Sequence, residues 1–78
     1  MYFKYTPLHW AAENGHLSVV EYLVTHNADI NAIGYRFDFF TCYQTPLHLA
    51  IRYNHIYFVD FLINQGANIN ATDEDLEF

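Results

Sequence analysis

Five histidines and one cysteine are the residues of this 78-residue chain that could ligate a metal or act in nucleophilic catalysis. They are His9, His16, His26, His48, His55 and Cys42. Zinc sites use ligands at short spacings such as C-x-x-C or H-x-x-x-H, and neither His9 nor His48 has such a partner. Cys42 has no histidine beside it in the sequence, and no glycine-rich phosphate loop follows a strand. We therefore expect structural histidines, no catalytic residues, no metal and no cofactor.

The chain is acidic, with a formal charge of −6 from nine acidic and three basic residues. Nucleic-acid binding needs a basic footprint that displaces counterions from phosphates. We therefore expect no nucleic-acid partner. Four of the nine acids lie in residues 73–78, which read DEDLEF, and we interpret this end as a solvated terminus.

The composition indicates an intracellular protein, either cytoplasmic or nuclear. A single cysteine allows no intrachain disulfide, which fits a reducing compartment. The first residues, MYFKYTPLHW, lack the basic region and apolar run of a secretory signal. No run approaches the ~18 apolar residues of a membrane span. We expect no membrane insertion and no small-molecule substrate.

The chain contains an internal repeat. The tetrapeptide TPLH stands at residues 6–9 and again at 45–48, an offset of 39 residues. At that offset residues 6–32 align without a gap with residues 45–71, and 12 of the 27 pairs are identical. The two stretches are therefore two copies of one supersecondary unit.

Each copy carries the signals of two short helices. Thr6 before Pro7 predicts an N-cap followed by proline at the first helical position. Apolar residues then recur at helical spacing in two stripes, which are Leu8, Ala11 and Ala12 and then Leu17, Val20, Leu23 and Val24, with Ile30 expected to plug the core from the loop. Glycine and asparagine tolerate positive φ, so Gly15, Asn27, Asn54 and Gly66 are predicted left-handed stops. We predict helices over residues 7–14, 17–26, 46–53 and 56–65.

The stretch TPLHWAAENGHLSVVEYLVTHNADINA (residues 6–32) closely resembles an ankyrin repeat. The resemblance implies an all-α repeat fold, a helix-turn-helix solenoid with short β-hairpin loops. It also implies that the threonine and histidine of each TPLH motif bond to each other and to the neighbouring turn. The motif residues are Thr6, Pro7, Leu8 and His9 in the first copy, and Thr45, Pro46, Leu47 and His48 in the second.

The resemblance divides the chain into five parts. These are a partial hairpin (1–5), repeat 1 (6–32), an enlarged inter-repeat hairpin (33–44), repeat 2 (45–71) and a partial hairpin with the acidic tail (72–78). The family period is about 33 residues, so about six residues are inserted here. Because the repeats align without a gap, the insertion lies in the hairpin, which reads IGYRFDFFTCYQ.

The inserted hairpin is rich in aromatic residues, and two interpretations of it stay open. It is either a self-packed loop that thickens the core or a protruding finger that binds a partner. Alternation places Tyr35, Phe37, Phe39, Thr41 and Tyr43 on one face and the intervening residues on the other. We do not expect the hairpin to join a larger sheet, because the rest of the sequence offers no other strand.

The resemblance implies a non-catalytic protein–protein interaction module, an adaptor or scaffold that binds a protein through its first helices and hairpin tips. The alternative is an accessory segment or fragment of a larger enzyme, channel or ubiquitin-ligase subunit whose activity lies elsewhere. The predicted partner-binding residues are Tyr5, Glu13, Asn14, Tyr35, Arg36, Phe37, Asp38, Phe39, Gln44, Arg52 and Tyr53. His26 and Gln65 match one further variable position of the family.

Five other residues have expectations attached to them. Trp10 stands where the family has leucine, and both a packing role and a binding role stay open for it. Tyr57 and Phe58 are expected to cover a neighbouring repeat that this chain lacks. Asn31 and Asn70 stand in a turn that is hydroxylated in some family members, and we expect their amides to hold that turn.

Overall fold

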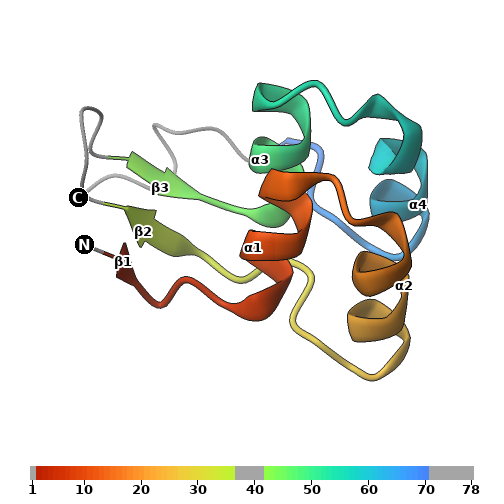
Figure 1. Cartoon of the computed structure of the whole chain (residues 1–78), viewed down its shortest axis with the longest axis horizontal. Coiled ribbons are helices and arrows are strands. Elements are labelled where there is room, and N and C mark those ends of the chain that lie inside the picture. The colour runs from red at the N-terminus through yellow and green to blue at the C-terminus, as the bar shows by residue number, and fades with distance from the viewer. Residues whose placement is uncertain (1, 37–41, 71–78) are drawn as a thin grey trace.

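Four α-helices and a small sheet make up the part of the chain that the computed structural model describes, residues 2–36 and 42–70. The elements in chain order are β1 (Tyr2–Phe3), α1 (Pro7–Asn14), α2 (Leu17–Thr25), β2 (Gly34–Arg36), β3 (Cys42–Gln44), α3 (Pro46–Arg52), the 3₁₀ helix η1 (Ile56–Phe58) and α4 (Val59–Asn64). Helix α1 lies beside α3, α2 and α4 form a second layer, and the strands project to one side (Figure 1). This confirms the predicted helical repeat fold.

Both first helices begin with the same capping arrangement. The Thr6 hydroxyl oxygen accepts a hydrogen bond from the His9 amide at 3.3 Å, and the Thr6 amide donates to His9 Nδ1 at 3.0 Å. Thr45 and His48 repeat the pair of bonds at 3.3 and 3.1 Å. Histidine thus takes the role that glutamate has in an ordinary capping box. The predicted bonding within each TPLH motif is confirmed.

The four predicted left-handed stops all have positive φ. The values are 73° at Gly15, 71° at Asn27, 62° at Asn54 and 104° at Gly66. Each lies just past the end of a helix. The two repeats have glycine and asparagine at opposite stops, and both residue types adopt the left-handed conformation that ends the helix. The first three predicted helices end within one residue of the observed ones. The fourth differs, because its first turn is the 3₁₀ helix η1.

The sheet corrects one expectation. It has three antiparallel strands in the order β1-β2-β3, with Tyr2 opposite Arg36 and Phe3 opposite Tyr35. The hairpin therefore does join a further strand, which the sequence analysis missed because β1 has only two residues. Tyr35 stands directly opposite Tyr43, which puts the two on one face, as the alternation predicts. Residues 37–41 lie outside the described part of the chain.

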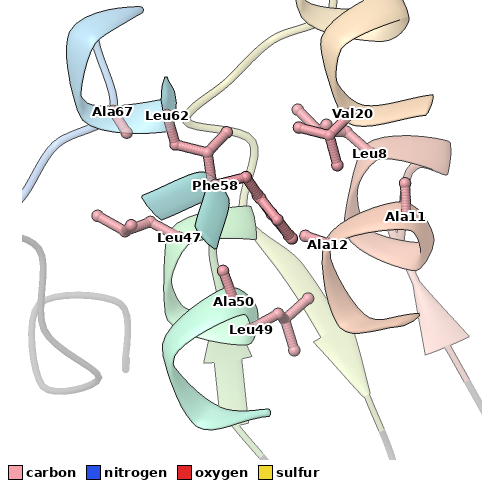
Figure 2. Close-up of a cluster of buried hydrophobic side chains, with 10 residues drawn as sticks. All are labelled: Leu8, Ala11, Ala12, Val20, Leu47, Leu49, Ala50, Phe58, Leu62 and Ala67. Atoms are coloured by element: carbon pink, nitrogen blue, oxygen red, sulfur yellow. The ribbon is translucent and has the colours of Figure 1, made fainter. Parts of the chain in front are cut away.

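The hydrophobic core lies between the two repeats (Figure 2). Its buried members are Leu8, Ala11, Ala12, Val20, Leu47, Leu49, Ala50, Phe58, Leu62 and Ala67. Ile30 packs against it from the loop, as predicted. Phe58 has no exposed surface, so the expectation that it covers an absent neighbour is wrong. The neighbour that Phe58 covers is repeat 1.

A single asparagine links the turns of the two repeats. The Asn31 amide nitrogen donates to the Gly66 carbonyl at 3.1 Å, and its Oδ1 accepts from the Asn68 amide at 2.8 Å. Asn31 therefore holds the turn of the next repeat. Each turn is also held from within, because Asp29 Oδ1 accepts from the Asn31 amide and Asn68 Oδ1 accepts from the Asn70 amide, both at 3.0 Å.

We expect Asn31→Ala to lower the free energy of unfolding by about 1–2 kcal/mol, because two inter-repeat hydrogen bonds worth about 0.5–1.5 kcal/mol each are lost. Urea unfolding followed by circular dichroism measures the change. Asn70→Ala is the matched control, since it removes the equivalent side chain without touching these two bonds. Equal losses in the two variants would contradict a role for Asn31 between the repeats.

Candidate protein-binding surface

The ends of the first helices gather exposed and half-buried residues that were predicted from the sequence to bind a partner. Because α1 and α3 pack side by side (Figure 1), equivalent positions on them are neighbours. Glu13 and Asn14 lie at the end of α1, and Arg52 and Tyr53 lie at the end of α3. Together with Tyr5 we call these four the helix-end surface.

Tyr5 and Glu13 form one unit of this surface. The Tyr5 hydroxyl donates a hydrogen bond to Glu13 Oε1. Its ring stacks on His9 with the ring centres 4.8 Å apart, and Trp10 meets it edge-on at 5.0 Å. The tyrosine is therefore fixed on both sides, and it presents an aromatic edge beside a carboxylate. Trp10 is 41% exposed, so both a packing and a binding role stay open for it.

The end of α3 carries the opposite charge. Arg52 is exposed, and Tyr53 is 41% exposed. On α1 the Asn14 amide nitrogen donates to the Trp10 carbonyl at 2.8 Å, which sets the direction of that side chain. The helix-end surface thus has a carboxylate and an amide on one helix and a guanidinium and a phenol on the next.

Repeat 2 holds the end of α1 in place. His55 Nε2 donates to the Glu13 carbonyl at 2.8 Å, and the Tyr57 hydroxyl donates to the Gly15 carbonyl at 2.5 Å. Neither bond was predicted from the sequence, which led us to expect only a structural histidine at position 55. The only sequence signal was the histidine shared by both copies at positions 16 and 55.

The hairpin residues of the prediction are distributed differently. Gln44 is 3% exposed, so its side chain does not contribute to the helix-end surface. Tyr35 is half-buried and lies against Tyr43, with the ring centres 4.6 Å apart. Arg36 belongs to β2, while Phe37, Asp38 and Phe39 lie outside the described residues.

His26 and Gln65 end the second-layer helices and are exposed. The His26 ring stacks on Tyr22 at 4.0 Å, and its Nδ1 donates to the Tyr22 carbonyl at 2.7 Å. This pair belongs to α2 and its end, in the layer that does not carry the helix-end surface (Figure 1). The structure therefore does not bring His26 together with the other predicted binding residues.

His9 joins the hairpin to the first helix. It is fully buried, and its Nε2 donates to the Gln44 carbonyl at 2.9 Å. Because Nδ1 accepts from the Thr6 amide, the ring is neutral with its proton on Nε2. Burial lowers the pKa of His9 below 6.5, against the opposing effects of the Gln44 and Ala32 carbonyls and the Asp29 charge. Gly34 lies so close to the ring that a Cβ on this residue would stand 2.8 Å from Nε2.

Within residues 2–36 and 42–70, no three histidine, cysteine or acidic side chains gather as metal ligands would. Across the same residues, no helix is both long and apolar enough to cross a membrane.

The sequence matches known proteins in two ways. A family model described as ankyrin repeats (3 copies) matches residues 2–73. Ankyrin repeat domain-containing protein 49 of Bos taurus is 63% identical over 30 residues, which are 38% of this chain and 13% of that protein. Alpha-latrocrustotoxin-Lt1a of Latrodectus tredecimguttatus is 55% identical over 31 residues, which are 40% of this chain and 2% of that protein. The matched stretches are thus small shares of both relatives.

Proposed function

The chain belongs to the ankyrin repeat family, whose repeats are a general protein–protein interaction module, and we propose that it is a non-catalytic adaptor or scaffold. Its binding site in this proposal is the helix-end surface together with the hairpin. The partner is a protein, and neither a nucleic acid nor a small molecule is its ligand. We place this activity in the reducing interior of the cell, in keeping with the lone cysteine.

The observation that supports the proposal is the fixed geometry of the helix-end surface. Tyr5 and Glu13 are bonded to each other, and His55 of the next repeat holds the Glu13 backbone. A surface ordered before binding loses little conformational entropy when a partner docks. Tyrosine and arginine are also the side chains that most often dominate interface energies, and Tyr53 and Arg52 lie next to this fixed pair.

A second candidate function rests on the lengths of the relatives. The matched stretches span 13% and 2% of those proteins. This favours repeats that serve as an accessory segment of a larger protein, such as an enzyme, a channel or a ubiquitin-ligase subunit. The same helix-end surface would then recruit the partner, and the activity would lie in another part of that protein.

We expect Tyr53→Ala and Arg52→Ala each to reduce the amount of partner recovered by affinity capture about tenfold or more, which corresponds to about 1.4 kcal/mol. Quantitative mass spectrometry of proteins captured on the immobilised chain measures the change. Thr25→Ala is the control, because it removes an exposed side chain of α2, in the other helix layer. Unchanged capture by both variants would exclude the helix-end surface.

Deleting residues 36–41 within the same experiment separates the two interpretations of the hairpin. A self-packed loop supports the core, so its deletion lowers the melting temperature by several degrees. A binding finger contacts the partner and not the core, so its deletion lowers capture and leaves the melting temperature unchanged.

A further inference from the structure

The internal repeat allows each surface position to be compared with its equivalent in the other copy. Phe58 is fully buried by repeat 1, whereas its equivalent in repeat 1, Val19, is 45% exposed. Ala12 is fully buried by repeat 2, whereas its equivalent in repeat 2, Ile51, is 59% exposed. Each exposed residue therefore stands at a position that is used for contact between repeats inside the chain.

Two apolar end surfaces result from this comparison. The leading end surface of repeat 1 contains Val19 and Tyr22, whose equivalents Phe58 and Phe61 belong to or pack against the core. The trailing end surface of repeat 2 contains exposed isoleucines, which are Ile51, Ile56, Ile63 and Ile69. Their equivalents in repeat 1 are all buried or packed against the core, namely Ala12, Leu17, Val24 and Ile30.

The two end surfaces match each other in side-chain size. Inside the chain the large Phe58 ring points toward the small Ala12 across the repeat interface (Figure 2). On the end surfaces the sizes are exchanged, since the smaller Val19 would face the larger Ile51. A small-for-large exchange across a contact preserves the packed volume, which interfaces require as cores do.

A second pair of positions shows the same exchange. Gly15 lies so close to Tyr57 that a Cβ on the glycine would stand 2.5 Å from the tyrosine hydroxyl oxygen. At the equivalent positions Asn54 has a side chain where Gly15 has none, and Ser18 is short where Tyr57 is long. Asn54 thus adds a side chain to the trailing surface, and the short Ser18 leaves room for it on the leading surface.

The polar links between the repeats have equivalents on the end surfaces as well. Asn70 stands at the position of Asn31, and the turn that it would hold contains Asn27 and Asp29 in place of Gly66 and Asn68. Asn27 and Gly66 both have positive φ, at 71° and 104°. His16, at the position of His55, would likewise meet the carbonyl of Arg52, which is the equivalent of Glu13.

We propose that the trailing end surface of this chain binds the leading end surface of a second copy, so that copies stack head to tail as the repeats do within one chain. The size exchanges and the duplicated polar positions favour a second copy over an unrelated protein. Such a contact is heterologous, so it extends beyond a dimer unless one end is blocked. Of the helix-end surface only the backbone carbonyl of Arg52 takes part in it, and the inference does not rest on the proposed function.

Sedimentation equilibrium of the full chain tests this stacking. We expect the weight-average mass to rise from monomer past dimer between about 10 µM and about 1 mM protein. Because every copy carries a charge of −6, added salt should strengthen the association by screening repulsion. A chain that remains monomeric at the highest concentration and at high salt would overturn the proposal, and the end surfaces would then fit repeats of another chain.

Two charge variants distinguish head-to-tail stacking from general stickiness. Val19→Glu blocks only the leading surface and Ile51→Glu only the trailing surface, so each variant alone should be monomeric. Their equimolar mixture should form a 1:1 dimer and nothing larger, because one intact surface of each kind remains. Self-association of either variant, or a mixture that stays monomeric while both variants keep the wild-type helical circular dichroism, would overturn the proposal.

Asn64→Glu is the matched control for added charge. Asn64 and its equivalent Thr25 are both exposed. Neither is covered by the other repeat inside the chain, so this position lies outside the contact between repeats and belongs to neither end surface. The variant should associate like the wild-type chain. Loss of its association would show that charge alone prevents stacking, which would overturn the assignment of the end surfaces.

Discussion

Phe58→Ala is expected to lower the free energy of unfolding by about 3–5 kcal/mol, the range for truncating a buried phenylalanine. The side chain is fully buried and belongs to the one core that both repeats share. Small domains have about 5–15 kcal/mol of stability in total, so this change should remove a large fraction of it. Urea unfolding followed by circular dichroism measures the loss.

Two comparisons make the Phe58 result specific. Phe58→Leu keeps most of the apolar volume and should retain most of the stability. Tyr22→Ala truncates an exposed aromatic ring and should change stability by no more than about 0.5 kcal/mol. If Phe58→Ala unfolds at the wild-type urea concentration, the two repeats do not share a core.

The same substitution also tests whether the repeats fold as one unit. Trp10 is the only tryptophan and lies in repeat 1, whereas Phe58 lies in repeat 2. In a single cooperative unit, Trp10 fluorescence and circular dichroism follow one transition, and Phe58→Ala shifts both equally. A fluorescence transition that stays in place would show that repeat 1 unfolds independently.

Local signals in the sequence predicted the helical part of the fold well. The cap at Thr6 with Pro7 and the stops at Gly15 and Asn54 act within a few residues of the helices they bound. Each signal also occurs at the equivalent position of both repeats, which distinguishes these helix ends from a glycine or asparagine elsewhere in the sequence. Helix boundaries were correct to within one residue for three of the four predicted helices.

Contacts between distant segments were predicted less well. The pairing of β1 with β2 involves too few residues to give a periodic pattern, and the bond from His9 to the Gln44 carbonyl joins residues 35 apart in the sequence. Of the predicted binding residues, those at the ends of α1 and α3 therefore lie together, whereas the hairpin residues are distributed differently.

One non-local signal was present in the sequence and went unused. Equivalent positions of the two repeats differ in size, as Ala12 and Ile51 do and as Val19 and Phe58 do. In both pairs one residue is buried and the other exposed. Because the smaller residue is buried in the first pair and the larger one in the second, the size difference marks these positions without showing which copy is buried there.

The stability of the chain is expected to fall as the pH drops below 6.5, because the pKa of His9 is lower in the folded state than in the unfolded state. Above pH 6.5 the ring is neutral in both states and its contribution to stability is complete. As the pH falls through 6.5 the unfolded chain takes up a proton that the folded chain excludes. The loss is at most about 1.4 kcal/mol per pH unit, and it continues down to the folded-state pKa.

The structural reason is the pair of bonds made by the neutral ring. Nδ1 accepts from the Thr6 amide, so a proton on Nδ1 would face an N–H group and break the capping arrangement. Nε2 already uses its proton to bond the Gln44 carbonyl. The neighbouring Asp29 favours the charged ring, but burial has the larger effect on the pKa. Protonation therefore disrupts the cap of α1, whereas the bond from Nε2 to the Gln44 carbonyl is kept.

His9→Gln should remove this pH dependence and lower stability at pH 7.5 by about 2–4 kcal/mol, because a buried amide and a buried carbonyl lose well-placed partners. Urea unfolding at pH 7.5, 6.5 and 5.5 gives the slope for each variant. His26→Gln is the matched control, since that ring is exposed, and it should keep the wild-type slope. If His9→Gln keeps the wild-type slope below pH 6.5, proton uptake by another group sets the acid stability of the chain.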